Sequence, residues 1–384
     1  MKKVMMIVLT LVWLLAACTP TVTPAHSIAT VIPTVVPTNS VVPTITFTPV
    51  STFTAVSTPT SWPDLANIYD ANKRLNHTVN LANAYGIWSN GEWSIMQEKY
   101  FNLISLAGFT AVRIPIEFSN HALNVAPYTI DPLFTNTVEW IVDTANHHGL
   151  VAIIDMHNYF SLMDDPTNQS ERFLALWKQI SEHYQSYPNS QVYFELLNEP
   201  TRGLNYMKWN DLLAKAIFII RQTNPLRPII VDNEATGDPS GTLSLQDLKL
   251  PDDPNLIASF HYYRPAQFTH QGADWIPGSH SWLGTTWDGT PQETAVIAYD
   301  FNLAASWAKS NKRPIFMGEF GALSTADHTS RVRWITAVRF AAEQNGFSWG
   351  YWDFCTKLPG FGVYDIDAQT WYFDLLSALI PINK

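Results

Sequence analysis

Short apolar runs alternate with longer amphipathic stretches along the chain from residue 64 onward. The apolar runs are rich in β-branched and aromatic residues, a composition typical of strands that are buried on both faces of a parallel sheet. Turn-forming or polar residues follow most of these runs. The pattern predicts strands at residues 77–82, 111–114, 151–155, 191–196, 228–232, 256–261, 314–318 and 348–352.

The amphipathic stretches between the apolar runs have the spacing of helices that cover a sheet with one face. Gly108 and Gly149 each directly follow such a stretch, where a left-handed C-terminal cap is expected. The predicted helices lie at residues 95–107, 133–148, 170–186, 206–223, near 243–248, and at 294–310, 328–345 and 371–379.

Eight strand and helix pairs in succession predict an α/β fold, a single (β/α)8 TIM barrel with long loops over residues 64–384. The alternative is a doubly wound open sheet. Such a sheet favours a glycine-rich turn after its first strand, and Asn83-Ala84-Tyr85-Gly86 lacks the G-x-G-x-x-G pattern. The barrel is therefore the preferred interpretation.

The first residues have the composition of a targeting segment rather than of a folded domain. A basic start is followed by an apolar stretch too short to span a membrane, and then by Leu15-Ala16-Ala17-Cys18. This tetrapeptide resembles the bacterial lipobox, in which the cysteine becomes the lipidated first residue of the mature protein. We expect residues 1–17 to be a lipoprotein signal peptide and Cys18 to carry the lipid. An ordinary secretory signal is the alternative.

Residues 18–63 repeat threonine, proline, valine and serine and, in their repetitive part, contain no charged side chain. Proline at this density blocks helices and central strands. The composition predicts a disordered stalk that separates a domain from a surface, and it is compatible with O-glycosylation. An ordered edge segment is the alternative.

Net charge and cysteine content narrow the class of protein. The formal net charge is −10, and the only basic run is at Lys2 and Lys3, which argues against a nucleic-acid partner. Two cysteines, one of them the expected lipid carrier, exclude a disulfide framework. The 15 tryptophans and 15 tyrosines provide flat rings that can stack on sugar faces as well as fill the core.

Two of the predicted strands end in a glutamate. Glu199 closes the run that begins at Val192, and Glu319 closes the run that begins at Pro314. The carboxyl ends of barrel strands form the face where barrel enzymes work. A pair of carboxyl groups delivered there suits glycoside hydrolysis, in which one protonates the leaving oxygen and the other attacks the sugar.

The other strand ends carry a set of motifs that resembles glycoside hydrolase family 5, which contains retaining cellulases and mannanases. The match extends in order from residue 76 to residue 380. Its motifs are Arg113-Ile114-Pro115, Asp155-Met156-His157, Leu197-Asn198-Glu199-Pro200, His261-Tyr262-Tyr263, Gly318-Glu319-Phe320 and Tyr351-Trp352-Asp353.

The resemblance implies a role for each of these strand-end residues. Glu199 would be the acid/base, which needs a pKa raised by an enclosed site, and Glu319 would be the ionised nucleophile. Six further residues would surround them. Arg113 and Tyr263 would support the nucleophile, and Asn198 would bind the sugar 2-hydroxyl. His157 and His261 would contact the sugar or orient the glutamates. Trp352 would form a platform beneath the sugar, and the peptide between Trp352 and Asp353 would be cis.

A loop after the sixth predicted strand resembles a loop of the thermostable, broad-specificity bacterial branch of the same family. In that branch the equivalents of His270 and Trp275 line the leaving-group side of the cleft. One position departs from the pattern, because the relatives have His-His-Tyr where this chain has His157-Asn158-Tyr159. Because of Asn158, the resemblance does not predict the sugar contacts on the non-reducing side of the cleaved bond.

The expected function is a retaining endo-β-1,4-glucanase that acts on plant β-glucan as a monomer without metal or other cofactor. A β-mannanase, a broad-specificity glucan and glucomannan hydrolase, or an exo-acting glucosidase are alternatives on the same scaffold. A metal-dependent barrel hydrolase and a non-catalytic glycan-binding lipoprotein are alternatives of other classes. We expect an extracellular protein, anchored to the bacterial membrane through Cys18 or secreted if that residue is not acylated.

Overall fold

The computed structural model describes residues 62, 64–82, 96–235, 240–355 and 359–381. The predicted signal peptide, Cys18 and the predicted stalk apart from Trp62 lie outside the described residues, as does Asn83-Ala84-Tyr85-Gly86. Among the described residues, no helix has both the length and the apolar character needed to cross a membrane.

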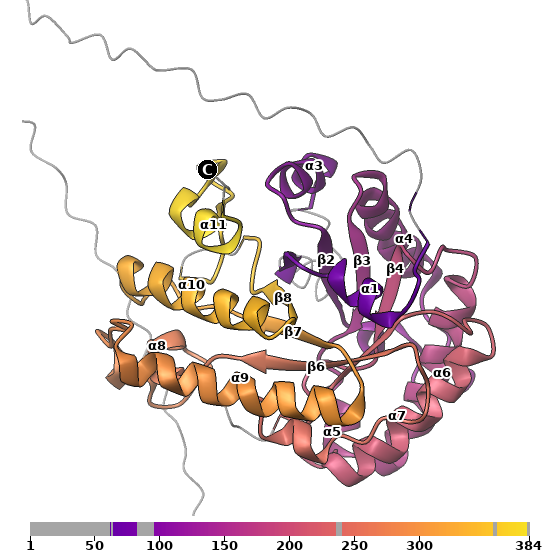
Figure 1. The fold of residues 1–384 in the computed structure, drawn as a ribbon. Coiled ribbons are helices and arrows are strands. Elements are labelled where there is room, and N and C mark those ends of the chain that lie inside the picture. The colour runs from indigo at the N-terminus through magenta and orange to yellow at the C-terminus, as the bar shows by residue number, and fades with distance from the viewer. Residues whose placement is uncertain (1–61, 63, 83–95, 236–239, 356–358, 382–384) are drawn as a thin grey trace, which may run out of the picture. The chain divides into compact units, whose positions relative to one another are not determined.

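Eight parallel strands close into a barrel in sequence order, which confirms the predicted fold (Figure 1). Each strand pairs with the next, and β1 pairs with β8 to complete the circle. The strands are β1 (Thr78–Asn80), β2 (Ala111–Ile116), β3 (Val151–Met156), β4 (Val192–Glu195), β5 (Ile229–Asp232), β6 (Leu256–Tyr262), β7 (Ile315–Phe320) and β8 (Ser348–Tyr351).

The helices that connect these strands surround the barrel, as Figure 1 shows for α6, α7, α9 and α10. Seven of the eight helix predictions correspond to α-helices. These are α3 (Glu98–Leu106), α4 (Pro132–His147), α6 (Pro166–His183), α7 (Tyr206–Arg221), α9 (Pro291–Asn311), α10 (His328–Gln344) and α11 (Phe373–Leu379).

Local signals explain where several helices begin and end. Thr290 caps α9 with a capping box, because its side chain accepts from the Glu293 N–H while the Glu293 carboxylate accepts from the Thr290 N–H. Gly108 and Gly149, with φ of 99° and 77°, terminate the helices before β2 and β3 in the left-handed conformation, as predicted.

Two helix predictions need correction. The segment near residues 243–248 is only a 3-10 turn, η2 (Ser244–Asp247), because it is too short for a sustained α-helical hydrogen-bond ladder. The last helix begins at Phe373 rather than at residue 371, because Trp371 belongs to a small antiparallel pair formed by β9 (Tyr364–Asp365) and β10 (Thr370–Trp371).

The sequence pattern did not predict the short elements outside the strand and helix alternation. They are α1 (Ile68–Lys73), η1 (Phe118–His121), α5 (Phe160–Asp164), α8 (Ala266–Thr269) and η3 (Ser279–Trp282). α1 closes the amino end of the barrel. The hydroxyl of Tyr193, which lies inside the barrel, donates to the Ala71 carbonyl, and Asn72 donates to the Ile315 carbonyl.

The buried apolar side chains form two main layers. The larger layer lies between the strands and the helices. The smaller one fills the amino end of the lumen, with Ile153, Tyr193 and Phe316 among its members, and Trp62 and Leu65 pack against it from outside. Burial of both strand faces explains why the strands are continuous apolar runs rather than alternating ones.

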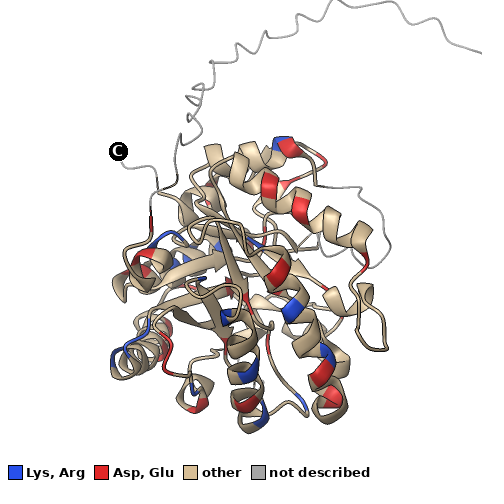
Figure 2. Ribbon diagram, turned by 90° about the vertical axis from the view of Figure 1, so that its right-hand side faces the viewer, with Lys and Arg blue, Asp and Glu red and all other residues tan. Residues whose placement is uncertain are grey.

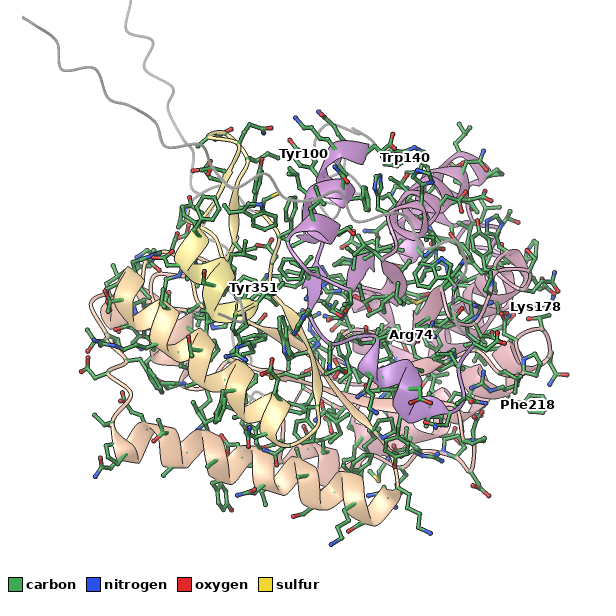
Figure 3. The ribbon with its side chains drawn as sticks, turned by 45° about the horizontal axis from the view of Figure 1, so that its top comes forward. Arg74, Tyr100, Trp140, Lys178, Phe218 and Tyr351 are labelled. Carbon is green, nitrogen blue, oxygen red and sulfur yellow. The ribbon has the colours of Figure 1, made fainter. Side chains whose placement is uncertain are left out.

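Most charged residues of the ribbon lie on the helices and loops around the barrel, as the coloured segments of Figure 2 show. Figure 3 labels Lys178 of α6 and Phe218 of α7, whose side chains lie at the outer margin of the view. Phe218 is 70% exposed, whereas Tyr351 of β8 is fully buried.

Candidate active site

Side chains in the barrel lumen change from apolar to charged along the strand direction. Every second residue of a strand faces the same side, so alternate residues line the lumen. The amino-end layer is apolar. The residue two positions further along β2, β3, β4 and β5 is charged and at most 1% exposed: Arg113, Asp155, Glu195 and Asp232. This buried charged layer lies at the carboxyl end, where barrel enzymes place their chemistry.

Glu319 joins the charged layer through a bulge in β7. The pairing of β6 with β7 shifts at His261, which pairs with Glu319 so that Gly318 is passed over. The extra residue changes the alternation of β7 and turns Glu319 into the lumen. Gly318 leaves room for this arrangement, because a Cβ there would lie 3.0 Å from both His261 Nε2 and Ser259 Oγ.

Arg113 connects the carboxylates of this layer. Its guanidinium donates to the two oxygens of Glu195 at 2.8 and 2.9 Å and to Oε1 of Glu319 at 2.7 Å. Asp155 Oδ2 lies 3.0 Å from the same group. Burial alone would lower the pKa of Arg113, but these carboxylates raise it well above its ordinary value. The arginine therefore stays charged and compensates the buried anions.

Both carboxylate oxygens of Glu319 are held by donors. Oε1 accepts from Arg113, and Oε2 accepts from the Tyr263 hydroxyl at 2.9 Å. The Glu319 side chain is 7% exposed. A cationic donor and a hydroxyl together stabilise negative charge on this carboxylate and fix its orientation.

Glu199 lies four residues beyond the end of β4 and has left-handed backbone geometry, with φ of 46°. Its N–H donates to Asp232 Oδ2 at 2.9 Å, and its Oε1 lies 2.8 Å from His261 Nδ1. The Glu199 side chain is 43% exposed, against 7% for Glu319. Of the two glutamates, Glu199 is therefore the one that solvent and a leaving group can reach more easily.

The protonation of Glu199 differs from the sequence expectation. Desolvation raises the pKa of Glu199, but the hydrogen bond and charge of His261 outweigh it and lower the pKa to about 2. Burial lowers the pKa of His261, but Glu319, Asp232 and Glu199 raise it to about 10. Both pKa shifts favour the proton on the His261 ring over the Glu199 carboxylate.

The two glutamates lie close together across the barrel end. A carboxylate oxygen of Glu199, one of Glu319 and a ring nitrogen of His261 all lie within 4.8 Å of one another. Retaining glycosidases hold their two carboxyl groups about 5–5.5 Å apart, and inverting ones hold them about 6.5–9.5 Å apart to accommodate a water. The 4.8 Å limit applies to one oxygen of each glutamate, and it shows that the two carboxylates face a common space.

His157 and Trp352 form a stacked pair beside the glutamates. The ring centroids are 5.8 Å apart and the planes differ by 9°, and His157 Nδ1 lies 2.6 Å from Asp155 Oδ2. Burial, with the charge of Arg113, lowers the pKa of His157 to about 4, so the imidazole is neutral. The Trp352–Asp353 peptide is cis, which confirms the prediction, and the indole is partly exposed rather than buried in the core.

The two asparagines of the predicted site lie at different depths. Asn198 is buried, and its Oδ1 accepts from Arg113 at 2.8 Å, which places it in the charged layer. Asn158 lies on the loop after β3, half-buried, with left-handed backbone geometry and φ of 52°. Asparagine tolerates this region better than most residues.

His270 and Trp275 extend the site along the loop after β6. His270 packs edge-on against Tyr263, with centroids 4.8 Å apart, and Trp275 packs edge-on against His270 at 6.3 Å. Burial lowers the pKa of His270 to about 4. Trp275 is 63% exposed, so its ring lies at the rim and not within the compact group around Glu319.

A cavity of about 240 Å³ adjoins Glu199 and His261 and extends to Glu234, His270 and Ile276. A larger depression of about 460 Å³, lined by Asn67, Ser190 and Asn255 among others, lies at the amino ends of the strands. The smaller cavity is the functional candidate, because it contains a glutamate of the paired set and lies at the carboxyl face.

Two groups of three side chains could in principle offer ligands to a metal ion: Glu195, Asp232 and His261, and Glu199, Glu319 and His261. In the first group, the oxygens of Glu195 accept from Arg113, and those of Asp232 accept from the backbone N–H groups of Glu199 and Asn233. The second group is the glutamate pair itself. The side chains of both groups take part in hydrogen bonds or ion pairs within the site.

Sequence reasoning missed three buried carboxylates that support the site: Asp155, Glu195 and Asp232. A signal for them was present, because each is a charged residue inside or at the end of an otherwise apolar strand. A charge in such a strand requires a partner. Only the three-dimensional arrangement shows that Arg113 is the partner of Asp155 and Glu195. Asp232 instead accepts from the Glu199 N–H and lies beside His261.

The chain is similar to known cellulases. The model of the family described as Cellulase (glycosyl hydrolase family 5) matches residues 67–358. Endoglucanase H of Acetivibrio thermocellus is 33% identical over 325 residues, which are 84% of this chain but 34% of that protein. The chain thus spans about a third of the length of that relative.

Two solved structures extend the comparison across the barrel. The endoglucanase Cel5A from Thermotoga maritima is 42% identical with a TM-score of 0.77, covering 82% of this chain and 100% of that chain. A structure of the same protein in complex with mannotriose gives 41% identity, the same coverage and a TM-score of 0.77. The chain therefore belongs to the cellulase family, glycosyl hydrolase family 5.

Proposed function

We propose that this protein is a retaining endo-β-1,4-glucanase in which Glu199 is the acid/base and Glu319 is the nucleophile. The observation that carries this proposal is the close approach of the two carboxylates at the carboxyl end of the barrel, where one oxygen of Glu199 lies within 4.8 Å of one oxygen of Glu319. The relatives named endoglucanase support β-1,4-glucan as the substrate class.

The reaction would take place in two displacements. In the first, a Glu319 oxygen bonds to the anomeric carbon, the glycosidic C–O bond breaks, and the leaving oxygen takes through Glu199 the proton that Glu199 shares with His261. In the second, water attacks the same carbon, gives a proton to Glu199 and releases Glu319 as a carboxylate. Each displacement inverts the carbon, so the product retains its configuration.

Residues around the pair would bind the sugar at the cleaved bond. Trp352, stacked on His157, would provide an aromatic surface beneath the ring. Asn198 would bond the 2-hydroxyl, with its orientation fixed by Arg113. His270 and Trp275 would line the leaving-group side, and Asn158 the non-reducing side, where it would make different contacts from histidine.

The direct test is product analysis with the purified protein. On carboxymethylcellulose the viscosity should fall much faster than reducing ends accumulate, which is the signature of internal cleavage. Proton NMR of an early reaction mixture should show the β-anomer first, followed by mutarotation. Initial α-product would contradict the retaining assignment, and release of cellobiose alone without loss of viscosity would indicate exo action.

A broader specificity is the second candidate, favoured by the complex of a 41% identical protein with mannotriose. Rates on carboxymethylcellulose, mixed-linkage glucan, glucomannan, pure mannan and xylan distinguish the candidates. We expect glucans to be cleaved fastest and glucomannan to be cleaved measurably. Preference for pure mannan would make the protein a mannanase, and binding of these polymers without cleavage would indicate a non-catalytic glycan-binding protein.

We further propose that Cys18 carries a lipid that anchors the protein to the bacterial membrane. The Leu15-Ala16-Ala17-Cys18 motif supports this proposal. In cells fed a labelled fatty acid, the wild-type protein should take up label and partition into detergent, and Cys18→Ser should do neither. Cys355→Ser is the matched control because it removes the other cysteine. Unlabelled wild-type protein in the culture medium would indicate a secreted enzyme instead.

A further inference from the structure

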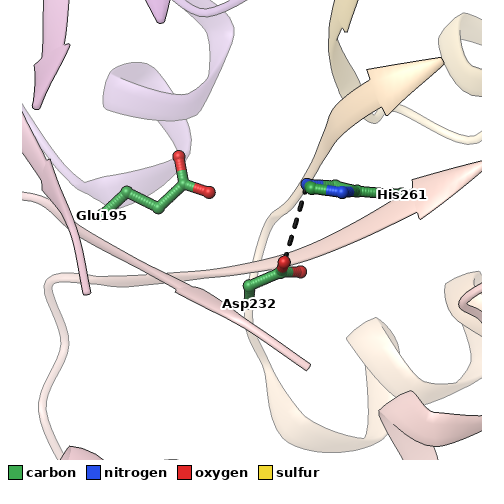
Figure 4. Close-up of side chains that lie close together, drawn as sticks. All are labelled: Glu195, Asp232 and His261. Carbon is green, nitrogen blue, oxygen red and sulfur yellow. Dashed lines mark ion pairs between the residues drawn. The ribbon is translucent and has the colours of Figure 1, made fainter. Parts of the chain in front are cut away.

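Asp232, at the end of β5, is a buried carboxylate that the reaction described above does not use. It is 1% exposed. Oδ1 accepts from the Asn233 N–H at 3.0 Å, and Oδ2 accepts from the Glu199 N–H at 2.9 Å. Oδ2 also lies 3.6 Å from His261 Nε2, the pair marked by the dashed line in Figure 4.

The opposite side of the same imidazole faces the glutamate pair. His261 Nδ1 lies 2.8 Å from Glu199 Oε1 and 3.6 Å from Glu319 Oε2. Asp232 thus contacts Glu199 directly at the Glu199 N–H, and it contacts the His261 imidazole, which in turn contacts the Glu199 carboxylate. Glu195, the third side chain of Figure 4, has both oxygens bonded to Arg113 and is not available for this purpose.

The backbone of Glu199 needs such support. A glutamate in the left-handed region is held there only when its surroundings fix it. The Glu199 N–H bond to Asp232 lies on one side of the residue, and the bond from the Ala235 N–H to the Pro200 carbonyl, at 2.7 Å, lies on the other. Both bonds connect the end of β4 to the end of β5.

We propose that Asp232 is a positioning residue for the acid/base: it fixes the backbone of Glu199 and holds His261 as the protonated donor that supplies Glu199. This inference rests on the function proposed above. The proton moves from His261 Nδ1 to Glu199 Oε1 and then to the leaving oxygen. In the second displacement, water returns a proton to Glu199, and that proton passes back to His261. The proton count is restored at the end of each turnover.

The charges around His261 agree with this role. Burial opposes protonation, but Glu319 and then Asp232 raise the pKa of His261 to about 10. Asp232 itself has a pKa raised to about 7 by burial, with His261 acting in the opposite direction. The charged and titratable groups that face this pair come from β2, β3, the end of β4, β6 and β7: Arg113, Asp155, His157, Glu195, Glu199, Tyr263 and Glu319.

The predicted pH effect has a definite sign. A group that Asp232 helps to keep protonated loses its proton at lower pH when the Asp232 charge is removed. The alkaline limb of kcat/KM, which reports loss of the shared proton, should therefore move to lower pH in Asp232→Asn. Asparagine has one acceptor oxygen in place of two, so either the Glu199 N–H or the Asn233 N–H also loses its bond.

Asp232→Asn should reduce kcat on p-nitrophenyl cellobioside about 10- to 100-fold, with KM nearly unchanged. This factor corresponds to the loss of one hydrogen bond to a charged group. On 2,4-dinitrophenyl cellobioside, whose leaving group needs little protonation, the loss of kcat/KM, which reports the first displacement, should be much smaller. The matched control is Asp253→Asn, which removes an aspartate paired with Arg221 at the amino end of β6. Asp253→Asn should leave unchanged both the pH profile and the ratio of the kcat/KM values on the two substrates.

A measurement on the wild-type protein keeps the inference testable even if Asp232→Asn does not fold. In ¹⁵N-histidine NMR at pH 7, the His261 resonances, assigned by their loss in His261→Gln, should show both ring nitrogens protonated. A neutral His261 would overturn the inference. So would an Asp232→Asn variant that folds and keeps its alkaline limb and its leaving-group ratio. Absence of any glycosidase activity in the wild-type protein would refute the proposed function instead.

Discussion

Glu319→Ala should abolish cleavage of β-1,4-glucan, with kcat reduced by roughly four orders of magnitude or more, as is usual for loss of a nucleophile. The reason is geometric as well as chemical. Arg113 and Tyr263 hold one oxygen each of this carboxylate, so no neighbouring carboxylate can replace it. Sodium azide should restore turnover of 2,4-dinitrophenyl cellobioside by entering the space of the lost side chain, and the glycosyl azide should have the α-configuration.

The matched control for this variant is Glu343→Ala, which removes a partly buried glutamate paired with Arg339 on α10. It should retain wild-type turnover. Circular dichroism and the melting midpoint should show that Glu319→Ala is folded, since Arg113 keeps two other carboxylate partners. A folded Glu319→Ala variant that still cleaves glucan, or an azide product of β-configuration, would remove Glu319 from the nucleophile role.

Glu199→Ala should show a different pattern, because in the proposed mechanism this residue acts in both displacements. We expect turnover of glucan to fall by about 10²- to 10⁴-fold, the usual contribution of a general acid or base. On 2,4-dinitrophenyl cellobioside the first displacement should remain fast while the second is slowed. A burst of dinitrophenolate followed by a slow steady state should result.

Azide should accelerate the slow phase of Glu199→Ala and yield a β-glycosyl azide, since it attacks the covalent intermediate from the side that water uses. Stopped-flow absorbance measures the burst, and NMR determines the configuration. If the two azide products are interchanged between the Glu199 and Glu319 variants, the assignment of roles is reversed. If Glu199→Ala lowers kcat/KM equally for substrates with good and with poor leaving groups, Glu199 does not protonate the leaving oxygen.

The barrel and the main strand ends could be predicted from the sequence because both depend on local patterns. Strands buried on both faces are continuous apolar runs, and the polar residue that ends such a run marks the carboxyl face. Glu199 and Glu319 were identified in this way. The short element near residues 243–248 was predicted less well, because short elements are determined by their surroundings rather than by their own periodicity.

The electrostatics of the site could not be read from the sequence. Glu319 faces the lumen only because of the bulge at Gly318, and the pattern of β7 does not specify a bulge. The charge of His261 results from groups on three strands or strand ends, and it reverses the expected direction of the Glu199 pKa. Such effects depend on distances between residues remote in sequence, which a linear pattern does not contain.

The entry of the chain into the barrel determines how the enzyme would face a substrate if it were attached to a surface. Trp62 and Leu65 pack beneath the lumen, and α1 follows them across the amino end, opposite the glutamates. A chain that enters at Trp62 therefore joins the closed base of the barrel, at the end opposite Glu199 and Glu319. Long, insoluble polymers could then approach from the environment without passing between the enzyme and its support.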